Sequence, residues 1–236
     1  MLHIFHFIRS TSCFLQGLSR VSVPVRYHVC FHAMKNCDVS KPDATEQFIK
    51  SAAKHLGGID TLVNNAGIGG PTATIEKILP EEWSKCLDVC LTSQFNCIRA
   101  AVPFLKDSNN ASIINLSSAA GRMGFAMRSP YAAAKWGVIG LTKSLAIELG
   151  DLNIRVNAVL PGVVSGERQE AVLRSKAEIR NISYEKVEAE ALSYSSIKNY
   201  VSAADIASQI IFLAGKNGRM ISGQAISVCG DLKMLA

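Results

Sequence analysis

"ASIINLSSAAGRMGFAMRSPYAAAKWGVIGLTKSLAIELGDLNIRVNAVLPG", residues 111–162, is the stretch that decides the fold. It opens with an apolar run over 111–118, continues with a helical pattern over 131–150 and ends with a second apolar run over 154–162. A strand, a helix and another strand at this spacing predict two parallel strands joined by a crossover helix. This order is typical of α/β proteins, in which helices cover both faces of a parallel sheet.

The same alternation extends to both sides of this stretch, from residue 34 to the C-terminus. We therefore expect a Rossmann-like doubly wound parallel sheet in a three-layer α/β/α arrangement. The further predicted elements are a strand over 34–39, a helix over 40–58, a strand over 59–67, a long helix over 80–107, a charged helical excursion over 166–200, a helix over 202–215 and a last strand over 224–230.

The pattern predicts one domain over 34–236, because no repeat or linker divides it. Residues 1–33 form an atypical N-terminal segment with no clear βα pattern, so the first βαβ unit is expected to be incomplete. Ser40 and Asp43 have the spacing of a capping box, which predicts the start of the helix over 40–58.

The positive charge of the chain is concentrated at its N-terminus. The net charge is +6, and residues 1–37 carry four basic residues and no acidic ones. The remainder is nearly neutral, so no basic face for nucleic acid is expected. No apolar run approaches the roughly 20 residues that a membrane-spanning helix needs, so no membrane association is expected either.

Seven cysteines occur without a CxxC pair, which argues against a disulfide framework or a metal site. Cys86, Cys90 and Cys97 fall near one face of the helix over 80–107, where we expect buried, small apolar side chains. This cysteine usage predicts a reduced, cytoplasmic protein.

Tyr131 and Lys135 lie four residues apart, on one face of the helix over 131–150. A free phenol has a pKa of roughly 10 and is a weak acid–base catalyst near neutrality. A neighbouring ammonium stabilises its phenolate form. Ser118 precedes Tyr131 by thirteen residues, at the end of a strand, where its hydroxyl is placed to hold a substrate oxygen. Such a trio relays a proton between carbonyl and alcohol, while a cofactor supplies the hydride.

Each of these patterns is weak by itself. Tyr and Lys commonly fall four apart on a solvated helix, and stretches such as Ser-Ser-Ala-Ala-Gly or Asn-Asn-Ala-Gly are often simple turns. The positions of these motifs nevertheless favour a functional role, because ligands of parallel α/β sheets bind at the carboxyl ends of the strands. The residues predicted at or just past a strand end are Asp38, Asn65, Ser118 and Pro161.

Taken together, these motifs resemble the classical short-chain dehydrogenase/reductase family, in the style of the 3-oxoacyl carrier-protein reductases. The resemblance covers about residues 34–236. Its matching pieces are "CDVS" (37–40), "LVNNAG" (62–67), "INLSSAAG" (114–121), "YAAAK" (131–135), "RVNAVLPG" (155–162) and "ISGQAISVCG" (221–230).

The resemblance implies an NAD(P)-dependent oxidoreductase that interconverts a secondary alcohol and a ketone. It implies that Tyr131 is the general acid/base, that Lys135 stabilises its phenolate and bonds the nicotinamide ribose, and that Ser118 orients the substrate. The excursion over 166–200 would be a variable substrate lid, or equally a solvated helix pair. The other cofactor-binding residues implied are Asp38 and Val39 at the adenine, Asn65, Ala66 and Gly67 at the adenosine ribose, and Pro161, Gly162 and Val164 at the nicotinamide.

The chain departs from the family pattern at several places. The glycine-rich T-G-x-x-x-G-x-G loop, which holds the cofactor pyrophosphate, has no counterpart before "CDVS". "VRYHVC" (25–30) is the only trace of a second strand, so the choice between NAD and NADP stays open. Cys90 replaces an Asn that helps to hold a water near the Lys, and Gly166 replaces a Thr near the cofactor, with Ser165 beside it.

Because of these departures, two alternatives to the hypothesis of an active enzyme stay open. One is a catalytically silent homologue that acts as an oligomerising or binding subunit, and another is a truncated fragment. The resemblance implies a homodimer or homotetramer formed through the helices over 80–107 and 131–149. The acid-free N-terminus fits a mitochondrial presequence, but we favour unrelated sequence in place of the first βαβ unit.

Overall fold

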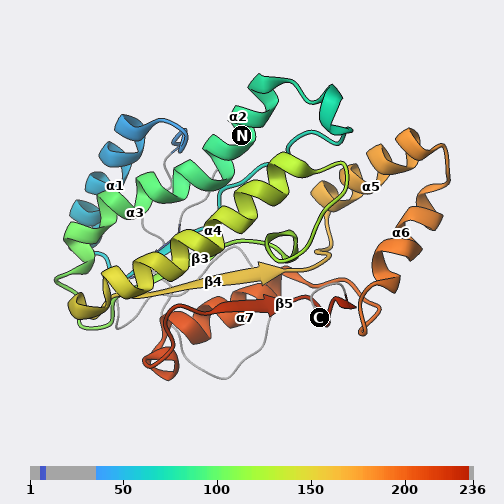
Figure 1. Ribbon diagram of the computed structural model, residues 1–236. Coiled ribbons are helices and arrows are strands. Elements are labelled where there is room, and N and C mark those ends of the chain that lie inside the picture. Colours follow the sequence, from blue (N-terminus) through green and yellow to red (C-terminus); the bar gives the residue numbers. More distant parts are fainter. Residues whose placement is uncertain (1–5, 9–35, 234–236) are drawn as a thin grey trace.

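The computed structural model describes residues 6–8 and 36–233, which form a five-stranded sheet with helices on both faces (Figure 1). The strands follow the order β1-β2-β3-β4-β5 across the sheet. Strands β2 to β5 are mutually parallel, as the sequence predicts, whereas β1 runs antiparallel to β2. The strands are β1 (His6–Ile8), β2 (Thr61–Asn64), β3 (Ser112–Leu116), β4 (Arg155–Pro161) and β5 (Ala225–Val228).

The register brings the carboxyl ends of the parallel strands to one edge of the sheet. Asn64 of β2 lies opposite Asn115 of β3, and Pro161 of β4 lies opposite Val228 of β5. A buried hydrogen bond of 2.9 Å from Asn64 Nδ2 to Asn115 Oδ1 joins the first two strands. The residues that follow these strands are therefore placed at one edge, as the sequence predicts.

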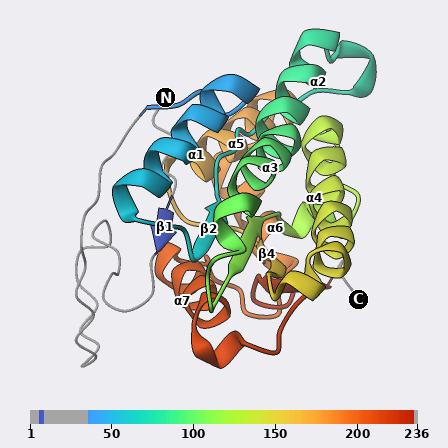
Figure 2. The same ribbon diagram turned by 90° about the vertical axis from the view of Figure 1, so that its left-hand side faces the viewer.

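Strand residues alternate between the two layers of helices, which explains why the strands read as continuous apolar runs. Leu62 and Ile113 pack against the layer that contains α1 and α3, whereas Val63 and Ile114 pack against α7. Figure 2 shows α1, α3 and α4 on one side of the sheet and α7 on the other. The helices of the two layers are α1 (Pro42–Leu56), α2 (Pro80–Leu87), α3 (Ser93–Leu105), α4 (Ser129–Glu148) and α7 (Ala203–Ala214).

The predicted charged excursion consists of α5 (Glu167–Arg180) and α6 (Tyr184–Ser193), which pack on each other through Leu173, Ala177 and Val187. Figure 1 shows both helices beyond the carboxyl ends of β4 and β5. They therefore lie at the edge of the sheet where a ligand is expected to bind. Within 36–233, no helix is long and apolar enough to cross a membrane.

The predicted helix over 80–107 is confirmed, but it has an irregular middle. A π-helical turn over Asp88–Thr92 joins α2 to α3, and Cys90 lies within this turn. Such turns within α-helices are frequently found at functional sites. The described part of the chain also forms four short 3₁₀ helices, at Ile75–Lys77, Ala119–Gly121, Gly150–Leu152 and Lys216–Gly218.

Two local predictions near residue 38 are wrong. Residues 36–39, the described part of the predicted strand over 34–39, form no strand: 36–38 have no regular structure, and Val39 begins a turn. The Asp38 carboxylate accepts bonds from both the backbone N–H and the hydroxyl of Ser40, at 3.0 and 2.7 Å. Since these bonds form an Asx-type turn, the Ser40 hydroxyl does not cap α1. Lys41 is the N-cap instead, without a side-chain cap, and Pro42 begins the helix.

We expect Gly162→Ala to lower the free energy of unfolding by about 1–3 kcal/mol, because the new methyl group would overpack a backbone contact. A Cβ at Gly162 would lie 2.7 Å from the Cα of Cys229, in the segment that follows β5. The matched control is Gly140→Ala in α4, where nothing lies within 4 Å of the added Cβ. Ala at this helical position should raise stability by up to about 1 kcal/mol. Urea unfolding measures the change in the free energy of unfolding for both variants. Equal midpoints for the two variants would refute the overpacking argument.

Candidate active site

The first two turns of α4 present the predicted Tyr–Lys pair beside the carboxyl end of β3. Tyr131 is half-buried and Lys135 is 4% exposed. The Nζ of Lys135 lies 5.6 Å from the centroid of the Tyr131 ring. The prediction that these two side chains share one helix face is therefore confirmed.

Two hydrogen bonds attach this part of α4 to the end of β3. Lys135 Nζ donates to the carbonyl of Leu116 at 2.7 Å, and Ser117 Oγ donates to the carbonyl of Lys135, also at 2.7 Å. The turn over 119–121 packs so closely that a Cβ on Gly121 would lie 2.7 Å from the Lys135 carbonyl oxygen. The ammonium of Lys135 is thus held in a fixed place by groups that the strand end supplies.

The two serines after β3 are not equivalent. Ser117 is buried, and its hydroxyl is bonded to the Lys135 carbonyl. Ser118 is half-buried and caps the short 3₁₀ helix, accepting a bond of 3.2 Å from the N–H of Ala120. Because its hydroxyl hydrogen is not used in that bond, Ser118 keeps a donor for a substrate oxygen. This difference supports the predicted choice of Ser118.

The Asn65–Gly67 turn after β2 lies against the same ammonium. A Cβ placed on Gly67 would lie 3.9 Å from Lys135 Nζ and 3.7 Å from Cys90 Sγ. Asn65 is exposed and Ala66 is buried. The structure therefore brings two predicted groups together, the turn after β2 and the Tyr–Lys pair.

Cys90, which stands where the family has an Asn, contacts this turn through its sulfur. Its Sγ lies 3.4 Å from both the backbone nitrogen and the carbonyl oxygen of Ile68. The pKa of Cys90 is lowered to about 6, chiefly by a hydrogen bond from the Cys86 thiol and also by the Lys135 ammonium, against the opposing effect of burial. In return, the pKa of Cys86 is raised. The buried positions predicted for Cys86, Cys90 and Cys97 are confirmed.

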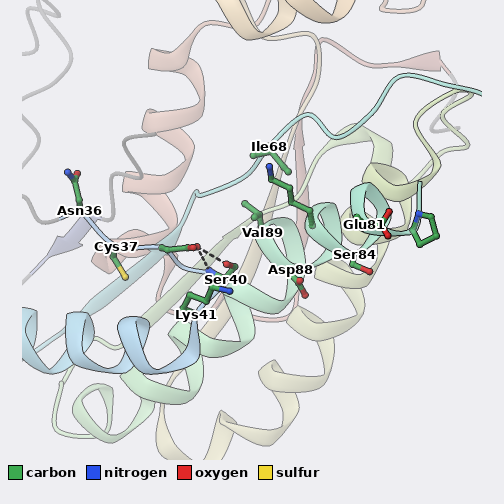
Figure 3. Close-up of a pocket in the computed structure, with 12 residues that line it drawn as sticks. Asn36, Cys37, Ser40, Lys41, Ile68, Glu81, Ser84, Asp88 and Val89 are labelled. Atoms are coloured by element: carbon green, nitrogen blue, oxygen red, sulfur yellow. Dashed lines mark hydrogen bonds between the residues drawn. The ribbon is translucent and has the colours of Figure 1, made fainter. Parts of the chain in front are cut away.

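The predicted cofactor contacts near the adenine adjoin a cavity of about 880 Å³. Asp38, Ser40 and Lys41 line one part of it, and Ile68 and Val89 line another (Figure 3). Its volume is in the range of small-molecule and cofactor sites. Ile68 also contacts Cys90, whereas neither Tyr131 nor Lys135 lines the cavity. Val39 beside it is fully buried, and its carbonyl accepts a bond from Thr45 Oγ1.

The predicted nicotinamide contacts lie at and after the end of β4. Pro161 is the last residue of β4, and the Gly162 N–H donates to the carbonyl of Val228 at 2.9 Å. Val164 pairs with Val201 in an isolated bridge just before α7. All three residues are half-buried at the edge of the sheet where the Tyr–Lys pair lies. "VRYHVC" falls outside the described residues, and the described residues contain no cluster of potential metal ligands.

The sequence interpretation missed the cations that surround Tyr131. The Cζ atoms of Arg128 and Arg168 lie 5.2 and 5.9 Å from the centroid of its ring. Arg128 precedes Tyr131 by three residues, a spacing that places both on one side of a helix start, and this was the available signal. Arg168 comes from α5, and no local pattern links it to Tyr131.

Known proteins resemble the chain over most of its length. A family model described as enoyl-(acyl carrier protein) reductase matches residues 26–231. D-beta-hydroxybutyrate dehydrogenase of Rhizobium meliloti (strain 1021) is 34% identical over 194 residues, which cover 82% of this chain and 75% of that protein. A 3-oxoacyl-(acyl-carrier-protein) reductase of Staphylococcus epidermidis is 34% identical over 197 residues, or 84% of this chain and 76% of the relative.

Solved structures of a ketoreductase and a dehydrogenase are also similar to this chain. Actinorhodin polyketide ketoreductase with NADPH superposes with a TM-score of 0.79 at 29% identity, over 84% of this chain and 77% of that one. NAD⁺-bound xylitol dehydrogenase gives a TM-score of 0.79 at 26% identity, over 82% and 76% of the two chains. The resemblance seen in the motifs is thereby confirmed, and the chain belongs to the short-chain dehydrogenase/reductase family.

Proposed function

We propose that the chain is an NAD(P)-dependent oxidoreductase that interconverts a secondary alcohol and a ketone. The observation that carries this function is the Tyr–Lys pair at the carboxyl edge of the sheet, with Lys135 Nζ 5.6 Å from the Tyr131 ring. The family and its dehydrogenase and ketoreductase members support the same reaction. Members bound to NADPH and to NAD⁺ both occur among the similar structures, so either nicotinamide cofactor is compatible with the fold.

In the direction of ketone reduction, the Tyr131 hydroxyl gives its proton to the carbonyl oxygen, and in alcohol oxidation it takes that proton back. The Ser118 hydroxyl donates to the same oxygen and fixes its place beside the phenol. The buried Lys135 ammonium stabilises the phenolate that forms after the proton is given away. Asp38 and the Asn65–Gly67 turn would hold the nicotinamide cofactor, which would supply or accept the hydride when bound.

We further propose a homodimer or homotetramer formed through α2, α3 and α4. These helices leave four large apolar side chains exposed to solvent: Trp83, Phe95, Trp136 and Ile147. Large apolar side chains exposed on helices of one layer support an association surface there. The cytoplasmic location expected from the cysteine usage remains a prediction, as does the mitochondrial alternative.

The deciding experiment is a titration of the purified protein with NADH and with NADPH, followed by nicotinamide fluorescence. We expect micromolar binding of at least one of them, with subsequent reduction of a ketone. The matched control for turnover is the Tyr131→Phe variant, which should bind the cofactor without reducing the ketone. A folded sample that binds neither cofactor at millimolar concentration would refute the proposed oxidoreductase function. It would favour the alternative of a catalytically silent subunit.

A further inference from the structure

Three basic side chains, Arg128, Arg168 and Lys176, form a cationic cluster around Tyr131 and Phe125. Arg128 contacts both rings, with its Cζ 5.2 Å from the Tyr131 centroid and 5.6 Å from the Phe125 centroid. Arg168 faces Tyr131, and Lys176 Nζ lies 4.4 Å from the Phe125 centroid. The cluster thus adjoins the phenol that we assign to proton transfer.

Arg128 is the central member, and it is almost completely removed from solvent. Only 2% of the residue is exposed. One of its terminal nitrogens donates to the carbonyl of Gly69, whereas its buried Nε has no hydrogen-bond partner within the described part of the chain. Burial lowers the pKa of Arg128, and the neighbouring Arg168 adds to this effect. A buried guanidinium with an unused donor is costly unless an anion pairs with it.

The described residues supply no carboxylate for this charge. The three ion pairs found over 6–8 and 36–233 are Lys50–Glu46, Arg99–Glu46 and Arg180–Glu190, and none includes a member of the cluster. The pKa of Lys176 is lowered by burial and by repulsion from Arg128 and Arg180. The cluster therefore carries positive charge in excess at one side of the proposed catalytic pair.

We propose that the substrate carries an oxyanion, a carboxylate or a phosphate, which the cationic cluster binds while the carbonyl lies at Tyr131. Arg128 provides the buried donor, and planar guanidinium groups suit both oxyanions because they form two parallel bonds. Arg168 and Lys176 belong to α5, so they complete the site from the excursion that adjoins the edge of the sheet. This inference rests on the proposed function, since it names the class of substrate for that reaction.

The cluster also adjoins the segment that we assign to the cofactor, because Arg168 Nη1 donates to the carbonyl of Gly67 at 3.5 Å. The other surroundings of the cluster favour the substrate over the phosphates of the cofactor. The cavity of about 880 Å³ that begins at Asp38 is lined by none of its three members. Arg128 instead contacts Phe125 and Gly69, and α5 supplies the other two cations. The cofactor titration separates the two possibilities, because Arg128→Gln should leave the dissociation constants of NADH and NADPH within about threefold of wild type. A tenfold or larger rise would assign the cluster to the cofactor and overturn the proposal.

The oxyanion site can be tested without turnover, using inorganic phosphate and acetate as probes. Ligands that bind only the folded state raise its melting temperature. At constant ionic strength against chloride, we expect at least one of these anions to raise the Tm of the wild type more than that of Arg128→Gln, with Arg128→Lys in between. Lys143→Gln, on the exposed face of α4, is the control and should respond like the wild type. Equal shifts in wild type and Arg128→Gln for both anions would overturn the site, whether or not a cofactor binds.

Matched ketones then identify the oxyanion. The pairs are 3-oxobutanoate with its methyl ester, and dihydroxyacetone phosphate with dihydroxyacetone, so each pair differs by one anionic group. We expect the anionic member of one pair to have the higher kcat/KM by about ten- to hundredfold, the contribution of a hydrogen bond to a charged group. Arg128→Gln should reduce that ratio to about threefold or less. An enzyme that binds cofactor and reduces the neutral members as well as the anionic ones would keep the proposed function and refute this inference.

Discussion

Tyr131→Phe is expected to lower kcat/KM for ketone reduction by about 10²–10⁴-fold, the usual contribution of a positioned general acid. The variant loses only the hydroxyl, and its half-buried ring keeps its packing against Cys86, Cys90 and Ala134. Folding stability and cofactor affinity should therefore remain close to those of the wild type. Steady-state kinetics with a saturating cofactor, together with urea unfolding, measure the two effects separately.

The control for this substitution is Tyr194→Phe, which removes the hydroxyl of a half-exposed tyrosine just after α6. Its kcat/KM should match that of the wild type. If Tyr131→Phe kept kcat/KM within about threefold, Tyr131 would not be the proton donor, and the function would need another acid near Ser118. If it also lost stability, the hydroxyl would have a structural role that the geometry does not reveal.

The parallel sheet could be predicted from sequence because its strands are buried on both faces. Leu62 and Val63, or Ile113 and Ile114, are neighbours in sequence that pack against opposite layers, so each strand is a short continuous apolar run. The helix of the Tyr–Lys pair could be predicted equally well, since it is rich in helix-forming residues such as Ala, Leu and Lys. Both features depend on neighbours within a few positions along the chain.

Most of the features that were missed depend on partners far apart in sequence, whereas the failed strand over 34–39 depends on a local turn. β1 pairs antiparallel with β2, which lies more than fifty positions away along the chain. No sequence pattern in residues 1–33 predicts this pairing. The predicted strand over 34–39 failed because one carboxylate, that of Asp38, bonds Ser40 and turns the chain. Arg168 reaches the Tyr131 ring from α5, a contact that only the tertiary fold creates. Sequence patterns therefore predicted the proton-transfer residues but not the cations around them.

Lys135→Met is expected to separate catalysis from stability even more clearly. We expect kcat/KM to fall by about 10²–10⁴-fold, because the phenolate of Tyr131 loses its stabilising ammonium. The affinity for the nicotinamide cofactor should fall as well, since the family resemblance places this ammonium at the nicotinamide ribose. The control Lys143→Met, two turns further along α4, removes an exposed ammonium and should change none of these quantities.

The free energy of unfolding of Lys135→Met should nevertheless equal that of the wild type or exceed it by up to about 2 kcal/mol. Lys135 is buried, and none of the ion pairs found among the described residues includes it. Replacing a buried charge by an apolar side chain of similar length is often neutral or stabilising. The Leu116 carbonyl keeps a donor in Gln94 Nε2, 3.2 Å away, so the substitution leaves no buried acceptor unpaired.

A stable but inactive Lys135→Met would mean that the fold tolerates a costly buried ammonium because the chemistry requires it. The pKa of Cys90, which the ammonium helps to lower, would then rise towards its ordinary value. If stability and activity were lost together, Lys135 would serve chiefly to join α4 to β3, and the Tyr–Lys pair would be a structural contact. Unfolding and kinetics on the same two lysine variants therefore decide between a catalytic and a structural role.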